Sequence, residues 1–288
     1  MPDRPRNIAA SVRQRLLNLA HARGEPMELL LTRYALERLL HRLSLSPHRE
    51  RFVLKGAMLL ATWFDEPHRA TRDVDLLGFG DAAEDALLAT FREIMAVEVD
   101  DGVSFDLKGL RIEAIREEVE YGGSRLRTTA ALAGARIPIT VDIGFGDAVE
   151  PGIEDIDLPV LLDMPSPHLR AYPLETVIAE KFHAMVVLGR ANSRMKDYYD
   201  VWMLIDSLEL EPQRMRRAIE ATFARRNTEI PVTVPDGLND EFSADAGKQR
   251  QWDAFVRNLS SQAPEFDRVV RELRDRLMVF ASPNTDRI

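Results

Sequence analysis

Hydrophobic positions in the first 45 residues recur at the three- and four-residue spacing of amphipathic helices. Val12 and Leu16 belong to one apolar stripe, and a second stripe runs over Leu29–Leu43. Gly24–Pro26 separates the two stripes, and glycine and proline both interrupt helices. The segment from Ile8 to Leu45 is therefore predicted to form two helices.

Short apolar runs bounded by turn residues replace this pattern after residue 50. The elements predicted next are a strand at Arg51–Leu54, a helix at Ala57–Phe64, a strand at Thr71–Leu77 and a helix at Ala82–Met95. Alternating stretches then flank Lys108-Gly109 and Gly134, and each predicts a hairpin. The strands expected in these hairpins are Val103–Leu107 with Leu110–Ile115, and Arg125–Ala133 with Arg136–Ile143.

The second half of the chain is mostly helical in pattern. The helices predicted are Leu174–Leu188, Met195–Leu208, Arg214–Arg226, Trp252–Leu259 and Pro264–Phe280. Pro165–Pro173 has the composition of a linker, and Pro231–Gly247 that of an exposed loop. We expect an α+β protein with an α/β lobe of N-terminal helices and a mixed sheet over residues 1–165, and a helical lobe over 166–288. A cleft between the lobes would be the default place for a site.

Composition narrows the chemistry of this chain of 288 residues. It has no cysteine, which excludes disulfides, thiol catalysis and iron–sulfur clusters. No apolar run has the length of a membrane span, and the first residues lack a secretory signal, so we expect a cytoplasmic protein without a membrane partner. The net charge of −9 argues against indiscriminate nucleic-acid coating but leaves room for a local basic groove.

The sharpest local feature is the pair Asp73 and Asp75 in the predicted strand Thr71–Leu77. Alternate residues of a strand share a face, so both carboxylates point one way while Val74 and Leu76 point into the core. Adjacent carboxylates repel each other, and a divalent metal would neutralise them. The alternative is a solvated strand end that carries Asp-x-Asp by chance.

A third carboxylate, Asp142, lies on a strand whose other face is apolar at Ile137, Ile139, Val141 and Ile143. If this strand neighbours the one with Asp73 and Asp75, the three carboxylates converge. Three acids around two magnesium ions suit nucleotidyl transfer, in which the metals neutralise a triphosphate and activate the attacking hydroxyl. The alternative is a surface aspartate on an edge strand.

Two further features could bind a triphosphate. Gly56 and Ala57 lie between a strand and a helix, where backbone N–H groups can approach a phosphate, and Lys55 precedes them. Lys181 falls inside an apolar helix stripe. It could serve as a phosphate ligand if it faces a cleft, or it could extend its ammonium outward into solvent. Gly56-Ala57 could equally be an ordinary strand-to-helix turn.

Basic residues between and along the later helices could follow an RNA backbone. Arg190, Arg194 and Lys196 lie between two predicted helices, and five arginines between Arg214 and Arg226 form a basic helix whose simpler explanation is a solvated face. At the start of the helix Met195–Leu208 we expect Asp197 to act mainly as a cap, and Asp200 to pair with Lys181 or Arg194.

The order of these motifs resembles the polymerase-β-type nucleotidyltransferase superfamily and, more narrowly, the AbiEii/AbiGii-type toxins, which include the mycobacterial MenT-like toxins. The resemblance spans roughly Phe52 to Leu204. The segments that carry it are Leu54–Ala57, Arg69–Asp75, Val141–Gly144, Ala179–Phe182 and Arg194–Asp200. One position departs from the family pattern: Ala57 stands where the family usually has glycine or serine after the first glycine.

The resemblance implies an Mg²⁺-dependent enzyme of the two-metal type that transfers NMP from an NTP to a hydroxyl. The catalytic set implied is Asp73, Asp75, Asp142, Lys181 and Asp200, with Asp73, Asp75 and Asp142 as metal ligands. Lys55, Gly56, Ala57, Arg72 and Lys181 would bind the nucleotide, and Arg190, Arg194 and Lys196 the RNA. The implied acceptor is the tRNA 3′ end or another RNA, and blocking that end would halt translation. The family also implies an antitoxin from a neighbouring gene.

Two other function classes remain open on the residues alone. A small-molecule nucleotidyltransferase, such as an antibiotic-modifying enzyme, would use the same three acids but would not need the basic segments. A non-catalytic nucleotide-binding module is compatible with Ala57, although the retention of all three acids argues against it.

Overall fold

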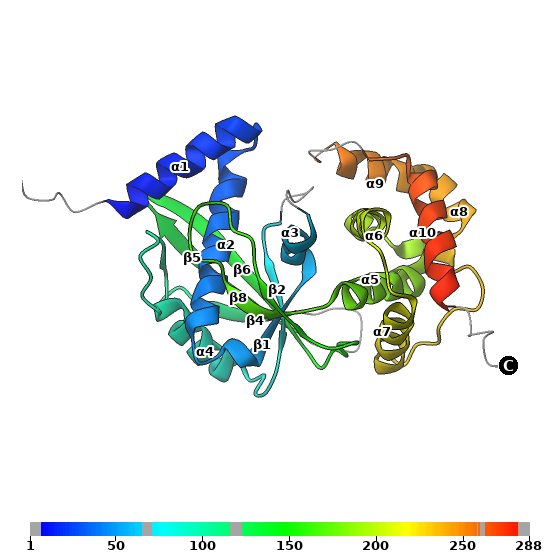
Figure 1. Cartoon of the computed structure of the whole chain (residues 1–288), viewed down its shortest axis with the longest axis horizontal. Coiled ribbons are helices and arrows are strands. Elements are labelled where there is room, and N and C mark those ends of the chain that lie inside the picture. Colours follow the sequence, from blue (N-terminus) through cyan, green and yellow to red (C-terminus); the bar gives the residue numbers. More distant parts are fainter. Residues whose placement is uncertain (1–6, 65–70, 116–122, 258, 260–262, 282–288) are drawn as a thin grey trace, which may run out of the picture. The chain divides into compact units, whose positions relative to one another are not determined.

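The computed structural model describes residues 7–64, 71–115, 123–257, 259 and 263–281. The chain divides into two compact units (Figure 1). Unit 1 comprises the chain up to Gly146 together with Glu154–Ala171. Unit 2 comprises Asp147–Ile153 and the chain from Tyr172 onward.

The helices of unit 1 pack against its sheet. They are α1 (Ile8–Arg23), α2 (Met27–Leu45), α3 (Leu60–Trp63) and α4 (Glu84–Ala96), with 3-10 turns η1 (Arg49–Arg51) and η2 (Gly56–Leu59). The predicted break between the first two helices is confirmed. Gly24 ends α1 in the left-handed conformation at φ 66°, and its N–H donates to the Ala20 carbonyl. α2 contacts α1, α4 and the sheet (Figure 1), which explains why 12 of its 19 residues are buried.

The sheet of unit 1 is mixed, as predicted. Its strands are β1 (Phe52–Lys55), β2 (Val74–Gly78), β3 (Ser104–Phe105), β4 (Arg111–Ile115), β5 (Gly123–Leu132), β6 (Ala135–Phe145), β7 (Glu154–Asp157) and β8 (His168–Ala171). They run in the order β3-β5-β6-β2-β1-β8-β7, and β4 also pairs with β5. The β2–β6 and β1–β8 pairs are parallel, and the remaining pairs are antiparallel. β1, β2 and β6 thus form the centre of the sheet.

One of the two predicted hairpins forms. β5 and β6 pair antiparallel across Ala133 and Gly134, whose φ angles of 46° and 84° suit a two-residue hairpin turn. The hairpin predicted around Lys108-Gly109 is wrong, because β3 and β4 each pair with β5 rather than with each other. β5 is long enough to offer both strands an edge, which a local turn signal does not reveal.

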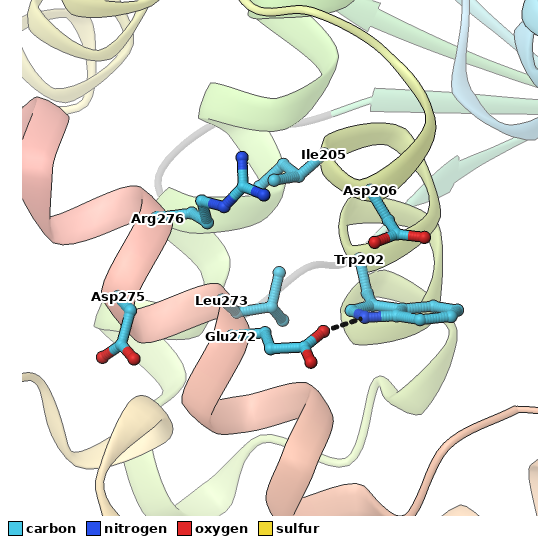
Figure 2. A pocket seen from close by; sticks show the side chains of 7 residues that line it. All are labelled: Trp202, Ile205, Asp206, Glu272, Leu273, Asp275 and Arg276. Carbon is cyan, nitrogen blue, oxygen red and sulfur yellow. Dashed lines mark hydrogen bonds between the residues drawn. The ribbon is translucent and has the colours of Figure 1, made fainter.

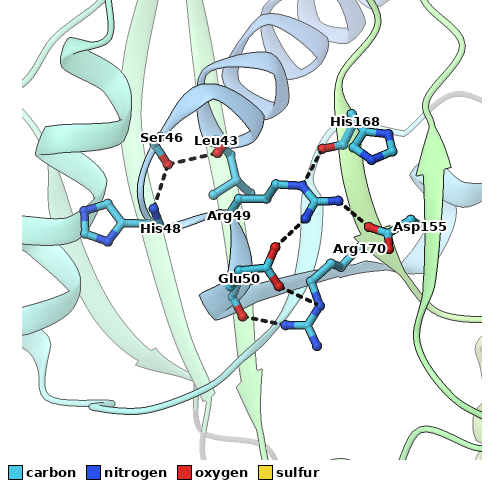
Figure 3. A network of polar contacts seen from close by, with 8 residues as sticks. All are labelled: Leu43, Ser46, His48, Arg49, Glu50, Asp155, His168 and Arg170. Carbon is cyan, nitrogen blue, oxygen red and sulfur yellow. Dashed lines mark hydrogen bonds and ion pairs between the residues drawn. The ribbon is translucent and has the colours of Figure 1, made fainter.

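The segment from residue 165 to 173, predicted to be a linker, contains the strand β8. Figure 3 shows the polar network that holds β8 and β7 against the η1 turn. Arg49 donates to the His168 carbonyl at 3.0 Å and pairs with Asp155 and Glu50. Arg170 pairs with the same Glu50, at 3.6 Å. A polar and proline-rich segment therefore forms an inner strand here, paired with β1 on one side and β7 on the other, because charged neighbours bind its polar groups.

Unit 2 is helical, as predicted. Its elements are α5 (Leu174–Leu188), η3 (Gly189–Ala191), α6 (Met195–Ser207), α7 (Pro212–Arg225), η4 (Asp236–Leu238), α8 (Asp240–Ala244), α9 (Ala246–Val256) and α10 (Phe266–Ala281). The prediction of an exposed loop at 231–247 is wrong, because η4 and α8 lie within it and bury Leu238 and Phe242. Phe242 packs on Tyr198, with ring centroids 5.6 Å apart. In the part of the chain that the structure describes, no helix has the length and apolarity to cross a membrane.

A buried ion pair joins α2 to the segment before β3, and it offers a test of the unit 1 core. Arg42 donates to both carboxylate oxygens of Asp101 at 2.6 and 3.1 Å, and both side chains are at most 3% exposed. Asp101→Asn should cost about 3 kcal/mol in urea unfolding, because it leaves a buried guanidinium without its counter-ion. As a control, Glu93→Gln removes the exposed partner of His48 and should cost less than about 1 kcal/mol. Equal costs for the two variants would contradict this assignment.

Candidate functional site

Four charged residues lie in register across the centre of the sheet in unit 1. Lys55 on β1 is paired with Asp75 on β2, Asp75 with Asp142 on β6, and Asp142 with Arg125 on β5. Directly paired residues of neighbouring strands project from the same face. These side chains therefore form one row, with two carboxylates in the middle and a cation at each end. We call it the charged row.

The apolar residues that alternate with the charged row face the opposite way. Val74 and Leu76 on β2 and Val141 and Ile143 on β6 are at most 1% exposed, whereas Asp75 and Asp142 are only half-buried. The expectation that these two strands are neighbours is confirmed by their parallel pairing. Burial of the apolar face fixes the register, because a slip of one residue would turn the aspartates into the core.

Asp142 is held by Arg125, a residue that the sequence analysis missed. Arg125 Nε lies 2.7 Å from Asp142 Oδ1, and Arg125 Nη2 lies 2.6 Å from Oδ2. These hydrogen bonds raise the pKa of Arg125, and the charges of Asp142, Asp73 and Glu113 raise it further. The signal in the sequence was an arginine on an alternating strand, which identifies a polar face but not the partner across the sheet.

Asp73 lies just before β2. It is half-buried, and the Thr71 hydroxyl donates to its Oδ1 at 2.9 Å. Arg72, beside it, is exposed. Arg69 and Ala70 of the same motif lie outside the described residues. Asp73 directly precedes the first residue of β2 and lies two residues before Asp75 along the chain.

Gly56 directly contacts the Asp75 carboxylate. Its φ of +74° is strained for any residue with a side chain, and a Cβ at this position would lie 2.0 Å from Asp75 Oδ2. The helix expected from Ala57 to Phe64 is instead the 3-10 turn η2 followed by the single turn α3. Glycine is thus required here for the placement of Asp75, whatever its backbone contributes to phosphate binding.

The charged row offers hard oxygen ligands of the kind that divalent cations prefer. Among the described residues, no group of three or more His, Cys, Asp or Glu side chains is arranged to hold a metal ion. Mg²⁺ needs fewer protein ligands, since it binds through one or two carboxylates together with substrate phosphates and water. Asp73 and Asp75 supply carboxylates of this kind, and both oxygens of Asp142 accept hydrogen bonds from Arg125.

Unit 2 contains a buried cluster of charges around Lys181 on α5. Its ammonium donates to Asp197 Oδ1 at 2.6 Å and to Asp200 Oδ2 at 2.9 Å, both from α6. The two aspartates are at most 1% exposed, and the Lys181 side chain is 13% exposed. The prediction that Asp200 pairs with Lys181 is confirmed. Lys181 does not extend into solvent, because two carboxylates hold it.

The prediction that Asp197 acts mainly as a helix cap is wrong. The N-cap of α6 is Arg194, without a capping hydrogen bond from a side chain, and Asp197 lies inside the first turn. Its Oδ2 lies 2.6 Å from Arg194 Nε, so it bridges Arg194 and Lys181. Tertiary packing against α5 gives this carboxylate a cation partner, and that removes it from the capping role.

The basic residues predicted to bind RNA differ in their surroundings. Arg190 pairs with Asp236 at 3.6 Å and with Glu241, and Arg194 pairs with Asp197. Lys196 is exposed. Three of the arginines on or next to α7 make internal contacts: Arg214 with Glu175, Arg216 with the Phe280 carbonyl and Arg226 with Glu180. That helix is therefore partly a packing element.

A pocket of about 270 Å³ lies between α6 and α10 (Figure 2). Trp202, Ile205, Asp206, Glu272, Leu273, Asp275 and Arg276 line it. Trp202 Nε1 donates to Glu272 Oε2 at 2.6 Å and ties the two helices together. None of the predicted site residues, all of which are described, is among this lining.

The fold of this chain resembles that of a solved protein structure. The fold is similar to that of JHP933 from Helicobacter pylori, with a TM-score of 0.50, 15% identity, and coverage of 89% of this chain and 93% of that chain. A second H. pylori crystal structure, described as a candidate nucleotidyltransferase, aligns with a TM-score of 0.48, 15% identity, and coverage of 88% and 94%. None of the curated proteins matches the chain.

The family assignment rests on the sequence. Residues 38–272 match the family model of the AbiEii toxin, the nucleotidyl transferase of type IV toxin–antitoxin systems. This match covers most of the chain, so the protein belongs to the AbiEii family and is a nucleotidyltransferase.

Alanine substitutions at two glycines with similar positive φ angles can separate the cost of backbone strain from the effect of a clash with Asp75. Gly56 and Gly134 have φ angles of +74° and +84°, but a Cβ on Gly134 would meet no atom within 4 Å. Both alanine variants should lose about 1 kcal/mol of stability to backbone strain. Only Gly56→Ala should also abolish nucleotidyl transfer, because Asp75 must move. Transfer at the wild-type rate by folded Gly56→Ala would contradict the contact.

The Lys181 cluster predicts that both of its aspartates stabilise unit 2. Asp197→Asn and Asp200→Asn should each lower the free energy of unfolding by about 3 kcal/mol, because each leaves buried cations with one carboxylate fewer. Asp206→Asn, at an exposed position of the same helix, is the matched control and should change it by less than about 0.5 kcal/mol. Urea unfolding measures the stability of all three variants. If Asp197→Asn and Asp200→Asn are as stable as the wild type, the cluster does not stabilise the protein.

Proposed function

We propose that the protein is an Mg²⁺-dependent toxin that transfers NMP from an NTP to an acceptor hydroxyl. The observation that carries the proposal is the charged row, in which Asp75 and Asp142 lie in register on parallel strands, with Asp75 against Gly56. Asp73 and Asp75 would hold the divalent ion, and two-metal binding would add Asp142. When bound, the metal neutralises the triphosphate and lowers the pKa of the attacking hydroxyl.

The protein's own groups bind the triphosphate and move the proton. Lys55, the Gly56 and Ala57 amides and Arg72 would contact the phosphates, and Lys181 is a further proposed phosphate ligand. Support for Lys181 comes from its two aspartate partners, which hold its ammonium at a defined position. Asp142 would take the proton of the acceptor hydroxyl, and this role requires one of its oxygens to leave Arg125.

We further propose the 3′ end of tRNA as the acceptor, so that the transfer blocks translation in the cytoplasm. Arg190, Arg194 and Lys196 would contact the RNA, and a neighbouring-gene antitoxin would counteract the toxin. The family supports a toxin with an antitoxin partner. Exposed Lys196 and half-exposed Arg194 are suitable for phosphate contacts.

A small-molecule acceptor is the second candidate, because one observation favours it. Arg190 is paired with acidic neighbours, and several arginines on or beside α7 are used in packing. These contacts reduce the basic surface available to an RNA backbone. Lys196→Glu separates the two functions, since it should weaken transfer to RNA and leave transfer to a small acceptor unchanged.

The decisive experiment incubates the protein with each α-labelled NTP, Mg²⁺ and total RNA, and then resolves RNA and protein. Asp75→Ala should reduce label transfer on the order of 10³-fold, because it removes a metal ligand. Lys181→Ala should also reduce it, and Lys181→Arg should restore it only in part, since a planar fork replaces a point charge.

Lys108→Ala is the matched lysine control, because Lys108 is exposed in unit 1 and its variant should transfer label normally. Lys248 would be a poor control, since its ammonium donates to the Asn192 carbonyl at 2.7 Å. Label in neither RNA nor protein from the wild-type enzyme would refute the proposed function.

A further inference from the structure

We propose that Arg125 is a resident counter-ion that competes with the divalent cation for Asp142 and thereby sets the affinity of the charged row for metal. The inference rests on the proposed function, because it takes the charged row to be the metal site. It assigns a role in metal binding to a residue that the proposed proton transfer only displaces.

The geometry of the pair makes the competition direct. Arg125 and Asp142 are directly paired across β5 and β6, and the guanidinium bonds both carboxylate oxygens, at 2.7 and 2.6 Å. A two-point contact of this kind is the strongest that arginine makes with a carboxylate. A cation that uses an Asp142 oxygen must displace at least one of these hydrogen bonds.

The charge pattern explains why a counter-ion is needed. Asp75 and Asp142 are in register on strands that run about 4.8 Å apart, so the two carboxylates repel each other. Arg125 supplies positive charge at the Asp142 end of this pair.

The exchange can take place without unfolding. The Arg125 side chain is 36% exposed and that of Asp142 is 18% exposed, so solvent ions reach the pair. A second carboxylate is available to a released Arg125, because Glu113 on β4 is its directly paired neighbour on the other side of β5. Glu113 already accepts Arg127 at 3.3 Å, which shows that its carboxylate is oriented along this face of the sheet.

The test measures Mn²⁺ binding by electron paramagnetic resonance on the full chain without nucleotide. Arg125→Gln should bind Mn²⁺ roughly fivefold more tightly than the wild type, because the competing cation is gone. Its melting temperature without metal should fall, and Mn²⁺ should raise that temperature more than it does for the wild type. Arg125→Lys keeps the charge but loses the two-point contact, so its Mn²⁺ affinity should lie between those of the wild type and Arg125→Gln. It replaces Arg125→Gln in the test if the glutamine variant does not fold.

Two further variants make the result interpretable. Arg127→Gln is the matched control, because Arg127 lies on the same strand and face but bonds Glu113, so its Mn²⁺ affinity should equal that of the wild type. Asp75→Asn should weaken Mn²⁺ binding strongly; if it does not, the proposed metal site itself is wrong. If Asp75→Asn weakens binding while Arg125→Gln leaves it unchanged or weaker, Arg125 is only structural and the inference is overturned. Undetectable Mn²⁺ binding in both the wild type and Arg125→Gln would overturn it too.

Discussion

The parallel pairing of β2 with β6 is the constraint on which the candidate site depends. It puts Asp75 beside Asp142, and the antiparallel neighbours β1 and β5 then add Lys55 and Arg125 to the same line. The apolar residues on the other face hold this register by burial, at most 1% exposed at Val74 and Val141. Placing two carboxylates side by side is electrostatically unfavourable, and the hydrophobic face is what keeps them there.

Unit 2 also holds two carboxylates close together, but there a lysine ammonium between them offsets their repulsion. Asp197 and Asp200 are buried on one helix, one turn apart, and this arrangement would be unstable without a cation between them. Lys181 supplies that cation from α5. The chain has few lysines among its 38 basic residues, and here the compact ammonium allows one side chain to bond two carboxylates. The same contact that stabilises the unit also fixes the position of the ammonium.

The structure also bears on Ala57, the departure from the family pattern. Gly56, not Ala57, is the position whose backbone conformation and contact with Asp75 admit no side chain. Ala57 is half-buried in the 3-10 turn that follows β1. An alanine at position 57 keeps its backbone N–H. The glycine on which the geometry of Asp75 depends, Gly56, is present in this chain.

The sequence by itself determined the first two helices, the helices of the second half, the hairpin at Gly134 and the acidic candidates, because periodicity, turn residues and paired aspartates are local signals. It also determined the family, through the order of its motifs. Only tertiary structure decided that β3 and β4 share β5, that residues 168–171 form a strand and that Phe242 is buried. It alone decided the partners of charges, Arg125 with Asp142 and Asp197 with Lys181. These partners lie on separate elements, 17 and 16 residues apart along the chain, and the spacing of residues within one element carries no information about which side chains of two elements will meet.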